Sequence, residues 1–418
     1  MVVVMNPKTG EILAMAAQPS FDPNRFAAFP AQALKNRVLT DTFEPGSTFK
    51  LFLLAAALEE RAVGLNDVFF CENGTFTVGG KIIHDVHKYG WLSVGEIIKV
   101  SSNIGASKVG RKLGKGKLHR TLKNFGFGHK TGIDLPGEVP GFLPAPQYWS
   151  EVGLANISFG QGVSVTALQL TTALAAVANG GVMMRPFIVK SVQERGGNVL
   201  KENQPKVSRR VISQETAKSI GTILKTVTEE GGTGKAAKLL GYETAGKTGT
   251  AQKALTTGRG YSDKRMGSFI GFAPADNPQG VITLIMDEPQ GIKYGGVVAA
   301  PAFKAIGEQV LPYMGIYPKG VTYLVQEVSR DLSPPPPSGD DSKTEPSPVP
   351  SKGSEILEEP GVMPDFSGKS IRQVIQISKK LGLNLRLEGS GRAVAQTPPP
   401  GRVLQGEIKG KVRFQPNI

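Results

Sequence analysis

The stretch Glu44-Pro45-Gly46-Ser47-Thr48-Phe49-Lys50 opens the segment around which the rest of the chain is organised. Proline and glycine favour a turn, and the run from Thr48 to about Glu60 is apolar nearly all round, which predicts a buried helix. Ser47 is therefore expected in the first turn of that helix. Lys50 follows three residues later on the same face, and helical side chains lean toward the N-terminus, so its amine is predicted to point at the Ser47 hydroxyl.

This spacing suits a nucleophile and its base. Apolar surroundings penalise the charged form of Lys50, so its pKa should fall from a reference value of about 10.4 and leave a neutral amine. A neutral amine beside Ser47 would activate its hydroxyl. The alternative is an N-cap serine followed by a lysine that extends to solvent, and a Ser-x-x-Lys pair alone does not exclude it.

The length, charge and cysteine content of the chain limit which classes of function it can have. A chain of 418 residues with 39% hydrophobic residues can form one large domain or several smaller ones. The net charge of +14 favours anionic surroundings, such as a phosphate-rich polymer, a membrane surface or nucleic acid. No arginine-rich stripe, zinc finger or aromatic RNA-binding signature accompanies that charge, so nucleic acid is not predicted. Cys71 is the single cysteine, which excludes an internal disulfide.

The sequence contains no strong motif for a metal site and no long apolar stretch that would span a membrane. His84-x-x-His87 lies in a polar, turn-like stretch that we interpret as a solvated loop, so no metal site is predicted. No stretch approaches the roughly 18 apolar residues of a membrane span, and no signal peptide is visible. Because Met1 to Met5 already has the pattern of a strand, we expect that a natural N-terminal part is missing.

The order of predicted elements indicates an α+β layered domain, with a strand pair first, then helices, then three strands. The predicted elements are a hairpin of Val2 to Met5 and Glu11 to Ala16, a short hairpin in Val68 to Gly80, a helix opened by the capping box of Ser93 and Glu96, helices over Thr166 to Ala178 and Ser213 to Glu229, strands over Glu243 to Gln252, Gly267 to Ala273 and Val281 to Met286, and a closing helix over Val297 to Leu311.

Composition changes after about Leu332. Residues 332 to 360 are rich in proline and serine and are expected to form an extended linker between a domain at 1 to 331 and a smaller one at 361 to 418. In the last segment Ser370 to Leu381 is amphipathic and Leu383 to Leu387 alternates like a strand, which predicts a small basic β-α-β-β module.

Two further motifs lie downstream of Ser47. Lys247-Thr248-Gly249-Thr250 is predicted in a strand, where Gly246 and Gly249 would let a peptide backbone pair closely while the ammonium and hydroxyls hold a carboxylate. Ser101-x-Asn103 at a helix junction offers a hydroxyl and an amide for proton relay and substrate binding. Each motif alone is also typical of a cap or a turn.

A phosphate-binding loop is the rival interpretation, since Gly241 to Thr248 satisfies that pattern and Asp287 follows a predicted strand. Such a loop must follow a strand and open a helix. Lys235 to Leu240 has a helical pattern instead, and the glycines after Lys247 do not favour a following helix. Nucleotide binding is therefore not predicted.

Ser-x-x-Lys, Ser-x-Asn and Lys-Thr-Gly occur here in the order found in penicillin-binding proteins and class A β-lactamases. The wider text, EPGSTFK, SSNIGASK, SFGQG, AGKTGTAQ and MDEP, resembles the transpeptidase domain of class B penicillin-binding proteins over roughly residues 1 to 316. EPGSTFK is similar to the septal, division-type branch, which includes sporulation relatives. Residues 361 to 418, with Met363 to Gly368 ahead of the helix, resemble a PASTA module.

The resemblance implies a penicillin-binding transpeptidase fold, with an antiparallel sheet flanked by helices and a helical subdomain. It implies a D,D-transpeptidase in which Ser47 attacks the penultimate D-Ala of a stem peptide ending in D-Ala-D-Ala, with Lys50 as base. Ser101 and Asn103 would relay the proton and bind substrate. An amine from a neighbouring stem would then resolve the acyl-enzyme, and β-lactams would acylate the same serine.

The third motif would hold the donor peptide. Lys247 is implied in the charge network, and Thr248, Gly249 and Thr250 in substrate binding, with the two threonine hydroxyls on the terminal carboxylate. The backbone N–H groups of Ser47 and Thr250 would form the oxyanion hole. The resemblance implies no metal and no cofactor.

The resemblance also implies the extracytoplasmic face of the bacterial cytoplasmic membrane and division proteins in the membrane as partners, although the family's anchor helix and pedestal domain are absent from this sequence. No Glu-x-x-Leu-Asn motif follows Ser101-x-Asn103, so a deacylating water of the class A β-lactamase kind is not indicated. The alternatives are a D,D-carboxypeptidase or β-lactamase, and a non-catalytic cell-wall binding or scaffold protein.

Overall fold

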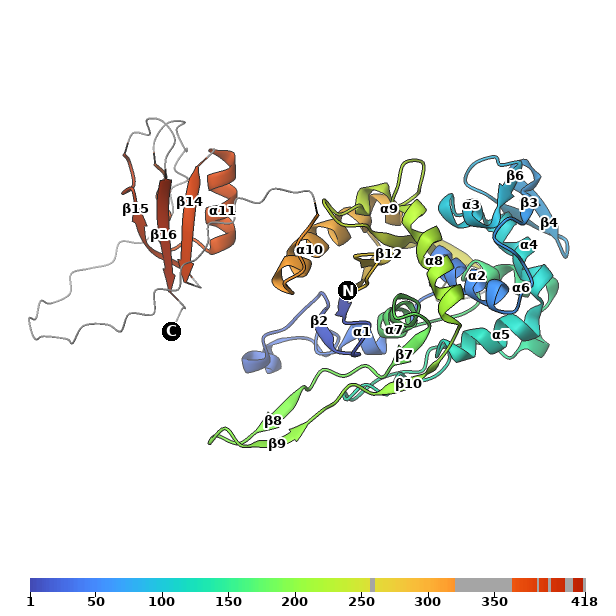
Figure 1. The fold of residues 1–418 in the computed structure, drawn as a ribbon, viewed down its shortest axis with the longest axis horizontal. Coiled ribbons are helices and arrows are strands. Elements are labelled where there is room, and N and C mark those ends of the chain that lie inside the picture. Colours follow the sequence, from blue (N-terminus) through green and yellow to red (C-terminus); the bar gives the residue numbers. More distant parts are fainter. Residues whose placement is uncertain (256–259, 320–362, 382, 390–391, 403–408, 416–418) are drawn as a thin grey trace, which may run out of the picture. The chain divides into compact units, whose positions relative to one another are not determined.

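The computed structural model describes residues 1–255, 260–319, 363–381, 383–389, 392–402 and 409–415. The chain divides into two compact units, Met1–Gln326 and Glu327–Ile418 (Figure 1). The predicted linker at 332–360 lies outside the described residues. Each unit has its own hydrophobic cluster, and each is described separately below.

A five-stranded antiparallel sheet forms the centre of the first unit, with the strand order β11-β12-β13-β1-β2. Its strands are β1 (Val2–Met5), β2 (Ile12–Ala16), β11 (Ala245–Ala254), β12 (Tyr261–Ala273) and β13 (Gly280–Asp287). The predicted N-terminal hairpin and the three late strands are thus confirmed, and β12 begins six residues earlier than predicted. The edge position of β11 leaves one side of the strand that carries Lys247 free of sheet pairing.

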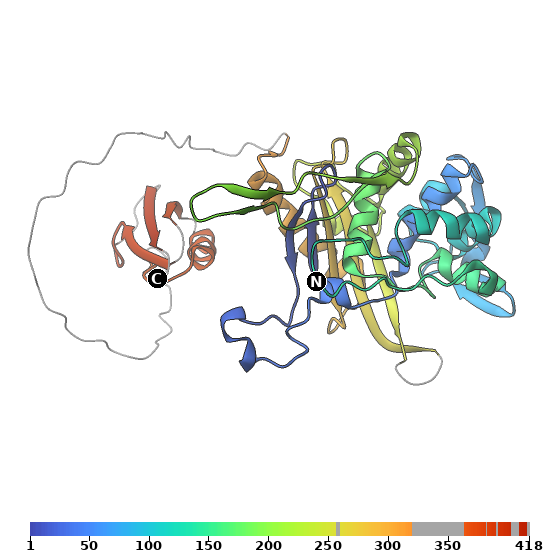
Figure 2. The same ribbon diagram turned by 90° about the horizontal axis from the view of Figure 1, so that it is seen from below.

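Alternating side chains bury both faces of this sheet. Val3 and Met5 belong to one core cluster and Val4 to another, as expected for a strand whose successive side chains point to opposite faces. Helix α7 (Ala167–Ala178) packs on one face and α10 (Ala300–Tyr313) on the other, and Figure 2 shows the green and orange helices on opposite sides of the strands. The result is the layered α+β architecture that the element order predicts.

Helix α2 (Lys50–Glu59) lies in the larger of these cores, where Lys50 to Ala57 are all buried. Its sides contact helices of the α-rich part of the unit, α4 (Asn103–Leu113), α5 (Lys115–Asn124) and α8 (Gln214–Val227). Phe52 stacks with Phe125 and Phe127 at ring-centroid distances of 5.0 Å. Each fully buried side chain of this size stabilises the fold by about 1.5–3 kcal/mol, so α2 is firmly fixed.

Several predicted helix starts are confirmed by their caps. Ser93 and Glu96 form the predicted capping box ahead of α3 (Val94–Lys99), and Thr166 with Gln169 forms a second one ahead of α7. The remaining short elements of the unit are α1 (Arg37–Thr40), α6 (Glu151–Ser158), α9 (Gly295–Val298), the 3-10 helices η1 (Pro23–Ala28), η3 (Glu72–Gly74), η4 (Pro146–Tyr148) and η5 (Lys235–Ala237), and the strands β7 (Val182–Met184), β8 (Ser191–Gln193), β9 (Val199–Glu202) and β10 (Val207–Arg210).

The predicted hairpin in Val68 to Gly80 is only partly right. Gly79 and Gly80 turn between β4 (Thr75–Val78) and β5 (Lys81–His84), whereas β3 (Val68–Phe70) pairs with the later β6 (Trp91–Ser93). The prediction placed β3 in a hairpin with the strand that follows it in the sequence. Its true partner β6 is more distant, and no turn motif between the two strands indicates that pairing.

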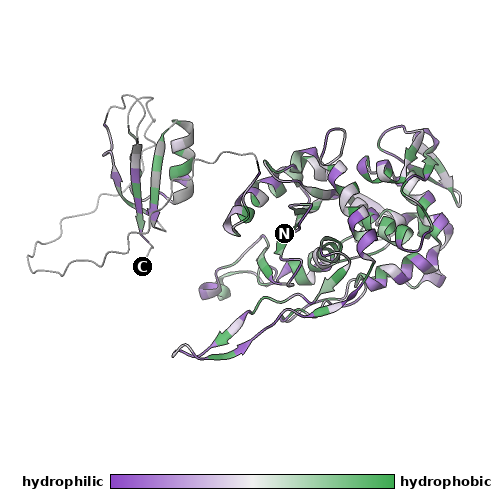
Figure 3. Ribbon diagram, viewed as in Figure 1, coloured by the Kyte–Doolittle hydropathy of each residue, from purple (hydrophilic) through white to green (hydrophobic). Residues whose placement is uncertain are grey.

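In the second unit, helix α11 (Ile371–Lys380) precedes the strands β14 (Asn384–Gly389), β15 (Arg392–Thr397) and β16 (Lys409–Gln415). Hydrophobic and hydrophilic residues alternate along α11, as Figure 3 shows. The described residues thus place three strands after the helix rather than the two predicted, while the segment before it contributes one bridge, between Ser370 and Arg392.

Candidate active site

Ser47 lies in the 3-10 helix η2 (Gly46–Phe49), which leads directly into α2. Gly46 has a φ of +56°, a region that favours glycine, and its N–H donates to the Gly160 carbonyl at 3.0 Å. A Cβ on Gly160 would lie 2.1 Å from the Gly46 oxygen, so this close crossing requires glycine. The turn that presents Ser47 is therefore held by a segment more than 110 residues away in the sequence.

Strand β11 packs directly on this turn. A Cβ on Gly249 would lie 2.2 Å from Ser268 Oγ and 2.8 Å from Thr48 Cγ2. The missing side chain of Gly249 therefore lets the strand approach the Ser47 turn and its neighbour β12. Its predicted part in substrate binding stays a prediction. The consequence is that the third motif and the serine turn form one rigid contact.

Lys50 is fully buried, and its Nζ contacts the second motif. It donates to the Ser101 carbonyl at 2.6 Å and to Asn103 Oδ1 at 2.8 Å, and it lies 3.2 Å from Ser101 Oγ. Burial lowers the pKa of Lys50 to about 7, an effect partly opposed by the negative charge of Asp85. Near neutral pH a large fraction of Lys50 is thus a free amine.

Lys247 reaches the same hydroxyl from the sheet. It is also fully buried, and its Nζ lies 3.0 Å from Ser101 Oγ and 3.1 Å from the Thr248 carbonyl. Burial lowers the pKa of Lys247 well below its usual value, and the neighbouring Lys50 lowers it further. Two amines that share one hydroxyl in a buried site disfavour double protonation, since like charges repel most strongly out of water.

The hydrogen-bond geometry fits a neutral Lys50. A neutral amine has two N–H groups and one lone pair, and the two shortest contacts of Nζ are to the carbonyl of Ser101 and the amide oxygen of Asn103, which only accept. The lone pair then remains for a hydroxyl proton. If Lys247 donates to Ser101 Oγ, the Ser101 proton is free to point toward Lys50, so a chain of proton carriers runs between the two lysines.

Asp85 is a residue that the sequence analysis missed. Its carboxylate accepts hydrogen bonds from the backbone N–H of Asn103 and Ile104 and from Ser102 Oγ, at the N-terminus of α4. Ser101 has a φ of +64°, which is unusual for serine, and these bonds hold the residues that follow it.

The carbonyl of His84 supplies a further contact to this motif, since it accepts from Asn103 Nδ2 at 2.9 Å. The stretch around His84, interpreted as a solvated loop, therefore supports the second motif through its backbone and Asp85, while the imidazole itself is exposed.

The threonines of the third motif are already engaged within the protein. Thr248 Oγ1 lies 2.8 Å from Thr233 Oγ1, and Thr250 Oγ1 accepts from the Gly295 N–H at 3.0 Å. Thr250 Oγ1 accepts in this bond, so it can still donate its own proton to an anion. Thr248 Oγ1 can do the same when Thr233 is the donor of their shared bond. Thr233, between α8 and η5, is a second residue that no local motif indicated.

The structure brings the predicted site residues together, but one predicted hydrogen bond is missing among the residues it describes. Within the described part of the chain, no hydrogen bond joins Lys50 Nζ to Ser47 Oγ, although one was expected from their spacing. Lys50 instead uses partners 51 and 53 residues away. Catalytic hydrogen bonds often form fully only with substrate bound, so this geometry leaves Lys50 available as a base.

The phosphate-loop interpretation is wrong. Lys247 and Thr248 lie in the middle of antiparallel strand β11, which runs on to Ala254, so no helix opens after them. Without a helix N-terminus the loop cannot cradle phosphates. Among the described residues, no group of three or more His, Cys, Asp or Glu side chains could hold a metal ion.

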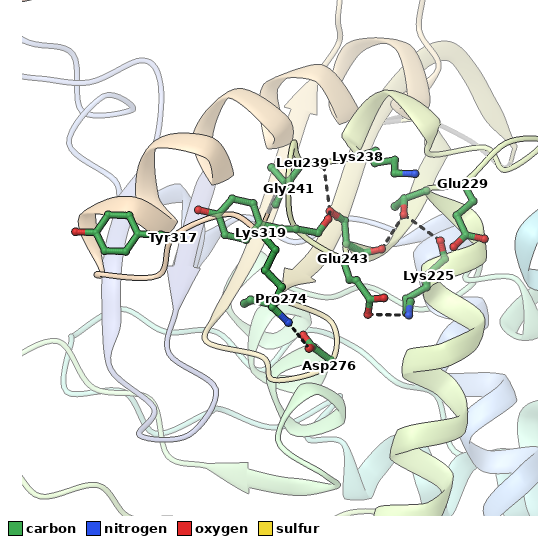
Figure 4. A pocket seen from close by; sticks show the side chains of 13 residues that line it. Lys225, Glu229, Lys238, Leu239, Gly241, Glu243, Pro274, Asp276, Tyr317 and Lys319 are labelled. Carbon is green, nitrogen blue, oxygen red and sulfur yellow. Dashed lines mark hydrogen bonds and ion pairs between the residues drawn. The ribbon is translucent and has the colours of Figure 1, made fainter. Parts of the chain in front are cut away.

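A separate cavity of about 350 Å³ lies at the start of β11, and Figure 4 shows it. It contains none of the predicted site residues, and four of its charged groups form two ion pairs, with Lys225 2.7 Å from Glu243 and Lys319 3.3 Å from Asp276. We therefore do not assign the chemistry to it.

Comparison with known proteins agrees with the geometry around Ser101. The model of the penicillin-binding protein transpeptidase domain matches residues 1–308. The chain belongs to this family. A PASTA domain model matches residues 361–409. Since the first match spans both lysines and both serines of the site, the motifs sit in the family's own domain.

The relatives of this penicillin-binding protein include a sporulation protein and a peptidoglycan D,D-transpeptidase. The chain is 42% identical over 322 residues to stage V sporulation protein D of Bacillus subtilis, which covers 76% of this chain and 50% of the relative. It is 36% identical over 321 residues to the peptidoglycan D,D-transpeptidase FtsI of Escherichia coli, covering 77% and 52%. The chain spans about half the length of these curated relatives.

Solved structures show the same fold. The transpeptidase domain of Burkholderia pseudomallei penicillin-binding protein 3 superposes with a TM-score of 0.66 at 33% identity and covers 77% of this chain and 89% of that one. Penicillin-binding protein 3 of Mycobacterium tuberculosis, solved with aztreonam, gives a TM-score of 0.70 at 34% identity, with coverage of 77% and 73%.

Proposed function

We propose that this chain is a serine-type peptidoglycan D,D-transpeptidase that cross-links stem peptides through a Ser47 acyl-enzyme and is acylated by β-lactams. The observation that carries the proposal is the convergence of two fully buried lysines, Lys50 and Lys247, within 3.2 Å and 3.0 Å of Ser101 Oγ. This cluster joins three motifs from distant parts of the sequence. It supplies a neutral amine and a hydroxyl relay in a buried site, a combination that can activate a serine nucleophile for acyl transfer.

In the first half-reaction Ser47 Oγ attacks the penultimate D-Ala carbonyl while Lys50 takes the hydroxyl proton. The C–O bond forms, and the tetrahedral intermediate places its negative charge toward the backbone N–H groups of Ser47 and Thr250. Losing one such donor typically costs about 10²–10³ in rate. The proton then passes through Ser101 to the leaving amine of the terminal D-Ala, and the C–N bond breaks.

Donor binding is assigned to the edge of β11 that has no sheet partner among the described residues. A stem peptide could pair with this edge strand, as peptides do at free sheet edges, while Thr248 and Thr250 donate to its terminal carboxylate. Lys247 adds positive charge beneath them, and Asn103 contacts the substrate amide. A β-lactam would occupy the same positions, and aztreonam, bound in the mycobacterial neighbour, is a β-lactam.

The alternatives differ in what resolves the acyl-enzyme. A D,D-carboxypeptidase or β-lactamase would use water, whereas a transpeptidase uses an amine. A non-catalytic cell-wall binding or scaffold protein would form no acyl-enzyme, and its buried lysine pair would have no use that justifies the cost of burying charge.

The proposed setting is septal cell-wall synthesis at the extracytoplasmic face of the bacterial membrane, with membrane-bound division proteins as partners. Support comes from the similarity to a relative named for sporulation and to a peptidoglycan D,D-transpeptidase, and from the EPGSTFK stretch, which resembles the septal branch. No helix in the described part of the chain is long and apolar enough to cross a membrane. Division of the chain into a catalytic domain at 1–331, a linker at 332–360 and a PASTA-like module at 361–418 remains part of the proposal.

Labelling with a fluorescent penicillin tests the proposal. Wild-type protein should gain a stable label, and mass spectrometry of the digested adduct should locate it on Ser47. Ser47→Ala should lose the label while its circular dichroism and melting temperature stay the same. Ser213→Ala, a helix-cap serine at the start of α8, is the matched control and should label normally. Equal labelling of Ser47→Ala would sink the assignment.

A further inference from the structure

A second cavity, of about 650 Å³, adjoins the Ser47 turn. Its lining comes from the approach to η2, from the segment after α6 and from the far end of β11, and includes Phe43, Glu44, Gly162, Ala251 and Lys253. A Cβ on Gly46 would lie 3.2 Å from Ala251 Cβ, so the cavity wall touches the residue before the serine. This volume is typical of a ligand site.

Glu44 is the chemically distinctive group in this lining. Its Oε1 accepts from the Gly162 N–H at 2.9 Å and from the Tyr261 hydroxyl at 3.3 Å. Its Oε2 is buried and has no hydrogen-bond partner among the described residues. A buried carboxylate oxygen without a donor is costly, so such an oxygen points to a ligand group or proton that binds there.

The other carboxylates of the lining already have cations. Asp41 pairs with Arg37 at 3.0 Å, and Asp287 pairs with Lys253 at 2.9 Å. Glu44 has no salt bridge within the described residues, and burial raises its pKa. The cavity therefore offers one uncompensated carboxylate, three residues before the proposed nucleophile, and the natural complement of that carboxylate is a cation.

We propose that this cavity binds the acceptor of the transfer reaction, a primary alkylammonium on a second peptide, and that Glu44 removes its proton. This inference rests on the function proposed above. An alkylammonium with a pKa of about 10.4 is almost fully protonated near neutral pH and cannot attack until it loses a proton. The carboxylate of Glu44, whose Oε2 has no hydrogen-bond partner among the described residues, is the group of this lining that can take it.

Atoms and charge are conserved when the acyl group moves from Ser47 to the acceptor amine. One ammonium proton moves to Glu44, and the neutral amine attacks the acyl carbon to form the new C–N bond. The bond between Ser47 Oγ and that carbon breaks, and Oγ recovers a proton from the attacking nitrogen through Lys50. The products are an amide, free Ser47 and a protonated Glu44, which then releases its proton to solvent.

The test separates acceptor chemistry from acylation. The full chain would be given a D-alanyl-D-lactate depsipeptide as donor and Nα-acetyl-lysine amide as acceptor, whose single free amine is a primary alkylamine. The products, amide and hydrolysed acid, are counted by mass spectrometry. Glu44→Gln should label with fluorescent penicillin within about twofold of wild type, whereas the ratio of amide to acid should fall at least about tenfold.

Two further variants sharpen the result. Glu243→Gln makes the same change of a carboxylate to an amide in the cavity of Figure 4, far from Ser47 in the sequence. It should leave both the penicillin labelling and the ratio of amide to acid unchanged. Glu44→Asp keeps a carboxylate and should retain more amide formation than Glu44→Gln. Because the ratio is taken over acyl-enzyme that has formed, partial loss of acylation does not alter it.

Each other outcome has a definite meaning. An unchanged ratio in Glu44→Gln, or an aspartate variant no better than glutamine, would overturn the acceptor site. A wild-type chain that labels but forms only hydrolysed acid would instead overturn transpeptidation and favour the water-using alternatives. Failure of the wild-type chain to label at all would instead overturn the proposed function on which the site rests.

Discussion

The lowered pKa of Lys50 leads to a specific pH dependence of acylation. If the neutral amine is the base, the second-order rate constant with benzylpenicillin follows the neutral fraction of Lys50, whose pKa is about 7. That fraction is about 9% at about pH 6 and about 91% at about pH 8, so the rate should rise about tenfold over this range and then level off. With an ordinary pKa of about 10.4, only about 0.4% would be neutral at about pH 8 and the rate would keep rising tenfold per unit.

Rapid-mixing measurements with a fluorescent penicillin at constant ionic strength would give this profile. Lys50→Arg, whose guanidinium stays protonated, should lower the plateau at least about a hundredfold. Lys112→Arg is the matched control, since Lys112 is half-exposed and paired with Asp67 at 2.7 Å, and it should not change the profile. A rate that climbs through about pH 9, or one that is flat from about pH 5.5 to 8.5, would refute Lys50 as a base with a pKa near 7.

Two other predictions concern the support of the site. Asp85→Asn removes the negative charge at the start of α4 and should slow acylation about tenfold, since hydrogen bonds to a charged group contribute about 1.5–3 kcal/mol. Because Asp85 raises the pKa of Lys50, this variant should also shift the rise of the acylation rate with pH to lower pH. If the rate and the midpoint of that rise stay unchanged, Asp85 does not have this role. Gly160→Ala should lower the melting temperature and acylation together, because its Cβ would clash with the Gly46 oxygen at 2.1 Å. Gly162→Ala, with its nearest atom at 3.8 Å, should cost only the roughly 1–2 kcal/mol of a left-handed alanine, and equal effects in a thermal melt would contradict the clash.

Local sequence patterns were sufficient where the determining contacts are local. The capping box at Ser93 is complete within four residues, and its helix begins where the box predicts. The helix predicted from Thr166 begins there as well, behind a capping box of Thr166 and Gln169. The apolar run of α2 likewise predicts burial from its own composition. The late strands could be recognised because their side chains alternate between the two cores.

The parts of the site that could not be predicted depend on contacts between distant segments. The spacing of Ser47 and Lys50 indicated a direct hydrogen bond, but the lysine is drawn to Ser101 and Asn103, which offer strict acceptors in a buried place. Asp85 has no motif of its own, and its role appears only when β5 is folded against the N-terminus of α4. Gly249 was correctly placed in the strand, but its close contacts with Thr48 and Ser268, which lie in distant segments, could not be predicted from the sequence.

The charges of the site explain why an anionic donor suits it. The negative charge of Asp85 raises the pKa of Lys50, while burial and the charge of Lys50 lower the pKa of Lys247. A carboxylate bound at Thr248 and Thr250 would favour the protonated form of Lys247. By the reciprocity of coupled sites, a proton on Lys247 disfavours one on Lys50. Binding of the donor's own carboxylate would thus hold Lys50 in the neutral form that removes the Ser47 proton. Recognition of the substrate and activation of the nucleophile are then electrostatically coupled. The rise of the acylation rate at acidic pH would report this coupling.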